Sequence, residues 1–206
     1  MRLKHIKNAE EDVLKGKYII IDPERYVGNW KKEFGNNNKI EVEIGMGKGN
    51  FIISKAKANP NINYIGVEKY ASVLLYANKK IQEDNITNLK IIYSDAINID
   101  KWFIREIHKI YLNFSDPWPK SRHEKRRLTS KQFLQKYSKI FKNIKIIEQK
   151  TDNDDFYKYS LKSFRKNGYI IVKKSVNYFD THRTEYEQKF IDKGKNINYV
   201  RVVKLL

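Results

Sequence analysis

Short apolar runs alternate with segments of helical spacing from residue 39 to the end of the chain. A short apolar run that stops at Gly, Asn or Asp is typical of a buried strand, whereas apolar residues three and four apart indicate a helix. Seven strands are expected, at 39–45, 62–68, 89–95, 107–114, 143–149, 168–176 and 197–204. Helices are expected between them, with clear patterns at 50–59, 70–81, 153–166 and 184–193.

A further helix is expected after residue 128, where the sequence carries a start signal. Thr129 and Gln132 have the spacing of a capping box, and Leu128 and Phe133 are placed to form its hydrophobic staple. Regular alternation of strands and helices predicts an α/β fold with a mostly parallel sheet covered by helices on both faces.

The 206 residues fit one α/β domain (1–206), and no linker or repeat divides them. The less regular residues 1–38 are interpreted as an N-terminal appendage to a core formed by 39–206. No apolar stretch approaches the roughly 18 residues of a membrane span, and the N-terminus lacks the apolar region of a signal peptide. These features predict a cytoplasmic protein.

The chain has no cysteine, and its four histidines are scattered at positions 5, 108, 123 and 182. Disulfides and thiolate chemistry are therefore excluded, and no metal site is expected from local spacing.

A formal net charge of +18 points to a polyanionic partner. Diffuse lysine is weak evidence in a chain rich in Lys, Asn and Ile, but the arginines are clustered. Of the nine arginines, Arg122, Arg126 and Arg127 lie in the single stretch SDPWPKSRHEKRR (115–127). Because the guanidinium fork suits phosphate, this stretch is a candidate phosphate-binding edge.

A glycine-rich turn follows the first expected strand, as E-x-G-x-G-x-G over Glu43, Gly45, Gly47 and Gly49. Glycine allows a tight turn to bring the backbone close to a ligand. The spacing differs from the dinucleotide fingerprint G-x-G-x-x-G, and a carboxylate before the turn disfavours a pyrophosphate.

Two more acids end the next two strands, Glu68 and Asp95. In a parallel sheet the carboxyl ends of neighbouring strands form one ligand-binding crevice. Glu68 is placed to hold both hydroxyls of a ribose, and Asp95 to reach an adenine amino group. With Glu43 they describe an adenosine-containing ligand without phosphates, such as S-adenosylmethionine. Alternatively, each acid only caps the helix that follows it.

Asp116 stands at the end of the fourth expected strand, inside the rigid sequence Asp-Pro-Trp-Pro. Pro117 and Pro119 fix their own φ angles and bias the residues before them toward extended conformations. Trp118 then offers a flat face on which a base could stack, unless it packs in the core. The basic residues that follow are interpreted as a phosphate-binding edge rather than a solvated loop.

The chain resembles the bacterial tRNA (guanine-N7)-methyltransferase family from about residue 40 to its end. The resemblance rests on five segments: FSDPWPKSRHEKRR, EIGMGKGNF, IGVEKY, KTDNDDFY and TEYE. It implies a class I, Rossmann-like methyltransferase fold with an antiparallel last strand, and S-adenosylmethionine as cofactor. It further implies tRNA as partner and transfer of a methyl group to N7 of a guanosine, at position 46 of the variable loop.

Site residues carry over from the family by matching motifs. The resemblance implies that Glu43, Glu68, Asp95 and Asp116 line the cofactor site, together with Gly45 and Gly47 of the glycine turn. It also implies contacts to the substrate nucleotide or to RNA, made by Lys120, Arg122, His123, Lys125, Arg126, Arg127, Asp152, Thr184, Glu185, Tyr186 and Glu187.

The late positions in this set also have a purely local interpretation. Thr184 and Glu187 have the spacing of a capping box, and Asp152 is placed to cap the helix that starts near Asn153. A cap whose side chain also faces the crevice would serve both purposes.

Guanine N7 bears a lone pair and no proton, so its methylation needs no general base. It needs alignment of N7, methyl carbon and sulfur, and stabilisation of the charge that moves onto the purine. Asp116 is therefore predicted to position the guanine and stabilise its cationic product.

Three other functions fit parts of the pattern. One is a nicotinamide oxidoreductase, which the glycine spacing disfavours. A second is another RNA methyltransferase, acting on an exocyclic amine. The third is a non-catalytic RNA-binding protein with the same fold, which the acids at all four strand ends disfavour. A monomer and a homodimer are both compatible with the sequence.

Overall fold

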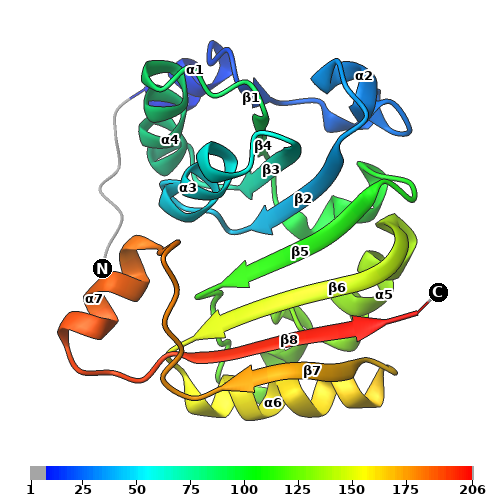
Figure 1. The fold of residues 1–206 in the computed structure, drawn as a ribbon, viewed down its shortest axis with the longest axis vertical. Coiled ribbons are helices and arrows are strands. Elements are labelled where there is room, and N and C mark those ends of the chain that lie inside the picture. The colour runs from blue at the N-terminus through cyan, green and yellow to red at the C-terminus, as the bar shows by residue number, and fades with distance from the viewer. Residues whose placement is uncertain (1–7, 206) are drawn as a thin grey trace.

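The fold is described by a computed structural model for residues 8–205. The first seven residues of the expected appendage, His5 among them, lie outside this range. Figure 1 shows one twisted sheet with helices on both sides. The strand order is β1-β4-β3-β2-β5-β6-β8-β7. The strands are β1 (Ile19–Ile20), β2 (Lys39–Ile44), β3 (Ile62–Glu68), β4 (Leu89–Tyr93), β5 (Ile107–Asn113), β6 (Phe141–Thr151), β7 (Ile170–Ser175) and β8 (Asn198–Lys204).

The sheet is parallel except for β8, which pairs antiparallel with β6 on one side and β7 on the other. The mostly parallel sheet and the antiparallel last strand are confirmed. The sheet has one strand more than the seven expected, because the two-residue β1 pairs with the edge of β4.

Helices cover both faces, as the alternation predicts, and each face has its own hydrophobic core. The α-helices are α1 (Ala9–Leu14), α2 (Trp30–Phe34), α3 (Asn50–Ala58), α4 (Ala71–Glu83), α5 (Lys131–Ile140), α6 (Asp154–Lys166) and α7 (Glu185–Asp192). The 3-10 helices within residues 8–205 are η1 (Pro23–Tyr26), η2 (Ala96–Lys101) and η3 (Ser121–Arg126). Residues of α1, α3 and α4 belong to one core, and residues of η2, α5 and α6 to the other.

The strand order reverses between β2 and β5. From β2 the chain builds outward through β3 and β4, then crosses back to place β5 on the other side of β2. Ligands of open parallel sheets bind outside the carboxyl ends of the strands at such a point. In Figure 1, α7 lies at this edge, beside the carboxyl ends of β5 and β6.

Residues 8–38 pack against the sheet through a buried tryptophan. Trp30 is fully buried, and its indole Nε1 donates a hydrogen bond to the carbonyl of Trp102 (2.8 Å). The carboxylate of Glu106 accepts from the backbone amides of Gly28 (3.0 Å) and Trp30 (3.3 Å). The segment is thus tied to the core by burial and by hydrogen bonds.

The predicted capping box at Thr129 is wrong by one residue. The N-cap of α5 is Ser130, whose hydroxyl accepts from the amide of Phe133. Thr129 is fully buried instead, and its hydroxyl lies 2.9 Å from that of Ser160. The contact with α6 satisfies the Thr129 hydroxyl, so the next hydroxyl in the chain serves as the cap.

Candidate active site

A cavity of about 1140 Å³ opens at the carboxyl ends of the central strands. It lies at the reversal of strand order, where the topology predicts a ligand site. Most of its lining comes from six segments, 44–50, 67–70, 94–97, 113–118, 151–153 and 184–186, and further lining residues come from 125–136, Val73 and Phe190. Every expected strand-end motif therefore contributes to a single cavity, although the residues within each motif have different roles.

The glycine turn forms one wall of the cavity. Gly45 and Gly47 have φ angles of +76° and +55°, which only glycine adopts without strain, and no atom lies within 4 Å of a Cβ built on either. The amides of Gly45 and Met46 both donate to the carbonyl of Val67, at 2.8 and 3.1 Å. The turn is therefore anchored to β3 while its backbone stays open to a ligand.

Glu68 holds the same turn with its carboxylate. Its oxygens accept from the amides of Gly47 (3.0 Å), Lys69 (2.8 Å) and Tyr70 (3.1 Å). Burial raises the pKa of Glu68, and the three amides oppose that rise. Because a carboxylate can accept about four hydrogen bonds, Glu68 retains capacity for a ligand donor at the cavity wall.

Asp95 is both a cap and a cavity residue. Its carboxylate accepts from the amide of Ile97 (3.0 Å) at the start of η2, and lies 3.4 Å from the Lys69 ammonium. The local and functional interpretations of this acid are therefore compatible.

Glu43 lies behind the cavity wall rather than in it. It is 1% exposed, and its Oε1 accepts from the side-chain amide of Asn113 (2.8 Å), which does line the cavity. Its Oε2 has no hydrogen-bond partner among the described residues. Burial raises the pKa of Glu43 to about 8, so this carboxyl is largely protonated at neutral pH.

Asp116 is exposed within the cavity, and its carboxylate has no hydrogen-bond or ion-pair partner among the residues that the structure describes. Two neighbours adopt left-handed backbone: φ is +52° at Phe114 and +43° at Trp118. The expected extended conformation of Trp118 is therefore wrong, although Pro119 follows it. Left-handed backbone is costly for a bulky residue and persists only where surrounding contacts impose it.

Arg127 supplies such contacts at Trp118. Its Nε donates to the carbonyl of Pro117 (3.0 Å), and its Nη2 to that of Trp118 (3.0 Å). Its guanidinium also lies 4.2 Å from the ring centroid of Tyr159. Arg127 therefore holds the Asp-Pro-Trp-Pro turn by its hydrogen bonds to two backbone carbonyls.

Arg126 has a different environment from Arg127. It is exposed, lines the cavity and lies 4.8 Å from the Trp118 ring centroid. His123 meets the same ring edge-on at 5.6 Å. Trp118 is half-buried between these residues, so it is not a core side chain.

The remaining cations of the stretch lie on or next to η3. Lys120, Arg122 and Lys125 are all exposed, and Lys125 lines the cavity. Their position extends a cationic surface outward from the cavity mouth.

Asp152 lines the cavity but does not cap α6. The cap is Asn153, whose side-chain oxygen accepts from the amide of Phe156 (2.8 Å), so the capping hypothesis for Asp152 is wrong. The Asp152 carboxylate instead pairs with Lys195 (3.1 Å).

Three residues of the 184–187 segment line the cavity, and the fourth is buried in the protein interior. Thr184, Glu185 and Tyr186 line the cavity, and Thr184 caps α7 by accepting from the amide of Glu187 (2.9 Å), as predicted. Glu185 pairs with Lys48 of the glycine turn (3.2 Å). Glu187 is fully buried, does not line the cavity, and pairs with Lys150 (3.1 Å).

Sequence reasoning missed Asn113 and Lys150. Asn113 is a polar residue inside an apolar strand, and Lys150 is a charged residue at the end of one. A polar side chain at the carboxyl end of a buried strand is itself a signal of a site, and it could have identified both residues.

Within residues 8–205, no helix is long and apolar enough to cross a membrane. The same residues contain no group of three or more His, Asp or Glu side chains arranged to hold a metal ion.

The fold is Rossmann-like and resembles that of solved methyltransferases. An antibiotic-related methyltransferase has a TM-score of 0.69 at 17% identity, over 93% of this chain and 98% of that one. A 16S rRNA (adenine(1408)-N(1))-methyltransferase from Catenulisporales acidiphilia, solved with its cosubstrate SAM, has a TM-score of 0.65 at 12% identity, over 91% of this chain and 93% of that one.

Sequence similarity narrows the class to a family. A family model described as putative methyltransferase matches residues 37–200. A tRNA (guanine-N(7)-)-methyltransferase of Geobacillus sp. is 46% identical over 96% of this chain and 93% of its own length. The corresponding protein of Lachnoclostridium phytofermentans is 45% identical over 96% of both. The chain belongs to the tRNA (guanine-N7)-methyltransferase family.

Proposed function

We propose that the protein transfers a methyl group from S-adenosylmethionine to N7 of a guanosine in tRNA. The observation that carries the proposal is the single cavity shared by the open glycine turn, the exposed Asp116 and the inner end of the cationic stretch. The substrate class is supported by the similarity to two tRNA (guanine-N(7)-)-methyltransferases.

The residues around the glycine turn fit this cofactor. Gly45 and Gly47 leave open space where a side chain would stand, Glu68 retains acceptor capacity, and Asp95 lines the same wall. We propose that these four residues hold the adenosine and amino-acid parts, and that Glu43 acts indirectly by orienting Asn113. When bound, S-adenosylmethionine supplies an electrophilic methyl group on a sulfonium.

The protein's part in the reaction is orientation and electrostatics. Guanine N7 attacks with a lone pair and loses no proton, so no residue has to act as a base. As the methyl is transferred, positive charge develops on the purine, and a nearby carboxylate stabilises that charge more than the neutral base. We propose that Asp116 has this role, because its carboxylate lies in the cavity without a hydrogen-bond or ion-pair partner among residues 8–205, and Arg127 holds the turn that carries it.

The exposed cations beside the mouth fit the RNA backbone. We propose that Lys120, Arg122, Lys125 and Arg126 contact tRNA phosphates or the target nucleotide, and that Asp152, Thr184, Glu185 and Tyr186, which line the same cavity, contact the target nucleotide. We expect the protein to act in the cytoplasm, as a monomer or a homodimer.

The test is incubation with unmodified tRNA and methyl-labelled S-adenosylmethionine. Borohydride reduction and aniline treatment then cleave the RNA at 7-methylguanosine, and we expect cleavage at position 46 of the variable loop. Label without cleavage would show methylation at another atom. Absence of label, with thermal protection by NADH and none by S-adenosylhomocysteine, would favour the oxidoreductase instead.

A further inference from the structure

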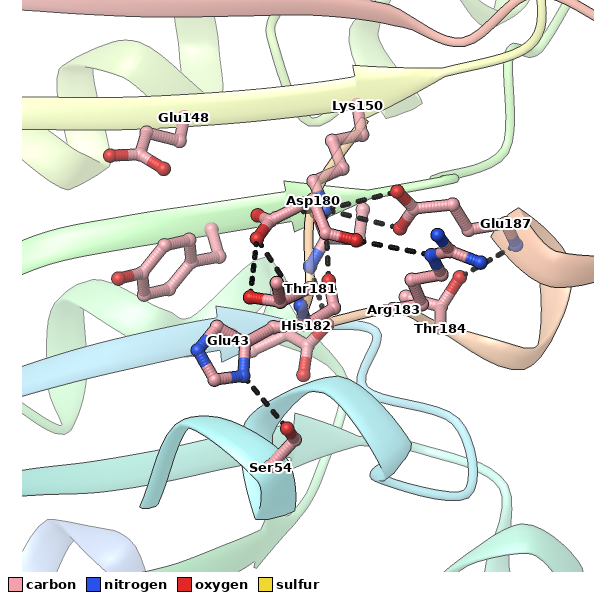
Figure 2. A network of polar contacts seen from close by, with 12 residues as sticks. Glu43, Ser54, Glu148, Lys150, Asp180, Thr181, His182, Arg183, Thr184 and Glu187 are labelled. Atoms are coloured by element: carbon pink, nitrogen blue, oxygen red, sulfur yellow. Dashed lines mark hydrogen bonds and ion pairs between the residues drawn. The ribbon is translucent and has the colours of Figure 1, made fainter. Parts of the chain in front are cut away.

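Lys150 is a buried cation at the carboxyl end of β6, immediately before two residues that line the cavity. Its ammonium contacts both carboxylate oxygens of Glu187 (3.3 and 3.1 Å), Oδ2 of Asp180 (3.3 Å) and the carbonyl of His182 (3.1 Å). Figure 2 shows these groups converging on the lysine. One ammonium therefore holds three points of the 180–187 segment.

The surroundings of Lys150 strengthen its ion pairs with Asp180 and Glu187. Its side chain is 4% exposed, and the rings of Phe51 and Tyr178 lie 5.2 and 5.5 Å from the ammonium. A charge buried among aromatic rings is costly unless it is paired, and removing its partners leaves an uncompensated buried charge. The folded protein is therefore strongly biased toward the arrangement in which Asp180 and Glu187 meet Lys150.

A second contact ties the same segment to α3. His182 Nδ1 lies 2.7 Å from the hydroxyl of Ser54 on α3, the helix that follows the glycine turn (Figure 2). The segment thus bridges β6 and α3. Thr184, Glu185 and Tyr186 lie in the chain between His182 and Glu187, and all three line the cavity.

We propose that Lys150 is a positioning residue for the tRNA substrate, and that Glu187 acts through Lys150 instead of touching the substrate. The proposal deepens the proposed function and rests on it. A direct contact would require an accessible carboxylate, whereas Glu187 is fully buried and both of its oxygens are held by the ammonium.

The test is a double-mutant cycle with Lys150→Met, Glu187→Gln and the double variant K150M/E187Q. Each single change should raise KM for tRNA roughly tenfold, whereas the affinity for S-adenosylhomocysteine stays within about twofold. If Glu187 acts through Lys150, the double variant should be no worse than K150M alone. If the two increases in KM for tRNA multiply in the double variant, Glu187 contacts the substrate directly and the proposal is overturned. An unchanged KM in K150M would also overturn it.

The matched control is Lys109→Met. Lys109 is also largely buried between two carboxylates, Glu41 (3.6 Å) and Glu148 (3.4 Å), but neither carboxylate belongs to or adjoins a segment that lines the cavity. This variant should lower the melting temperature without changing KM for tRNA.

Amide hydrogen exchange of the substrate-free protein supplies a readout that does not depend on activity. K150M should increase deuterium uptake in peptides covering 178–192, whereas K109M should not. If K150M does not fold, the E187Q variant tests the proposal by itself. Increased deuterium uptake in peptides covering 178–192 of E187Q would support the proposal, and unchanged uptake with a raised KM for tRNA would overturn it. Were the wild type inactive on tRNA, the proposed function would fail, whereas the exchange data would still show whether Lys150 holds the segment.

Discussion

Arg127 holds the backbone of Trp118: its Nη2 donates to the Trp118 carbonyl at 3.0 Å, and its Nε approaches the same oxygen at 3.3 Å. Trp118 has a left-handed φ of +43°, and two residues before it stands the cavity acid Asp116. The cationic stretch therefore contains at least two kinds of arginine. Arg127 shapes the turn, and Arg126 is exposed at the cavity mouth.

Replacing these two arginines separately should give different results. Arg127→Ala removes charged hydrogen bonds from a strained turn and should destabilise the fold by about 1–3 kcal/mol, with a marked loss of kcat. Arg126→Ala should leave the melting temperature nearly unchanged. It should weaken tRNA binding and reduce the slope of log K against log salt by about 1, as expected for a lost phosphate contact.

Thermal melts, steady-state kinetics and salt titrations of the two variants check this division. Arg165→Ala is the control for Arg126→Ala, because Arg165 is an exposed arginine on α6 that lies outside the cationic stretch and does not line the cavity. An Arg127→Ala protein with wild-type stability and kcat would contradict the structural role.

Asp116→Asn should separate chemistry from cofactor binding. The change keeps size and shape but removes the charge that stabilises the cationic purine, so kcat should fall by roughly 100-fold or more. The affinity for S-adenosylhomocysteine should change by about threefold at most, because the charge acts on the purine. Single-turnover methyl transfer and calorimetry measure the two quantities.

Asp84→Asn is the control for Asp116→Asn: this aspartate pairs with Lys57 and lies outside the cavity lining. An Asp116→Asn enzyme that turns over at the wild-type rate would eliminate the electrostatic role of Asp116.

The sheet and the cavity were largely predictable because both follow from local pattern. Apolar runs and helical spacing located the strands, and parallel strands bring their carboxyl ends together whatever their detailed packing. The two-residue β1 was missed because pairing at an edge leaves almost no periodicity. Thr129 was assigned as a cap because its burial against Ser160 depends on a helix some thirty residues later.

The roles of individual site residues were less predictable, because they depend on which side chains meet across the sheet. Asp116 and Glu187 are both acids within family motifs, yet one is exposed in the cavity and the other is buried against Lys150. Likewise Arg126 and Arg127 are adjacent in sequence, but Arg126 is exposed at the cavity, whereas Arg127 is partly buried against backbone carbonyls. The sequence pattern identified where the cavity lies. Only the three-dimensional contacts distinguished the residues that line the cavity from the residues that position those lining residues.

Trp30→Phe should weaken the attachment of the N-terminal segment without affecting the chemistry. Phenylalanine fills most of the buried space but cannot donate to the Trp102 carbonyl, so a loss of about 1–3 kcal/mol in the free energy of unfolding is expected. Denaturant titration measures the loss, and kcat at a temperature below the melting transition should be unchanged. A reduced kcat in the folded variant would mean that the segment contributes to the active site.

The buried Glu43 should make the stability of the protein depend on pH. In the unfolded chain its carboxyl ionises near 4.5, whereas in the folded protein it keeps its proton up to about 8. Between these values the folded state binds one proton more, so this residue lowers the free energy of unfolding by up to about 1.4 kcal/mol per unit of rising pH.

Glu43→Gln removes the ionisation and still accepts from Asn113, so its gain in melting temperature over the wild type should grow from pH 5 to pH 8. Asp22→Asn, at an exposed acid paired with Arg25, is the control. A gain that shrinks with rising pH would show that Glu43 is ionised in the folded protein.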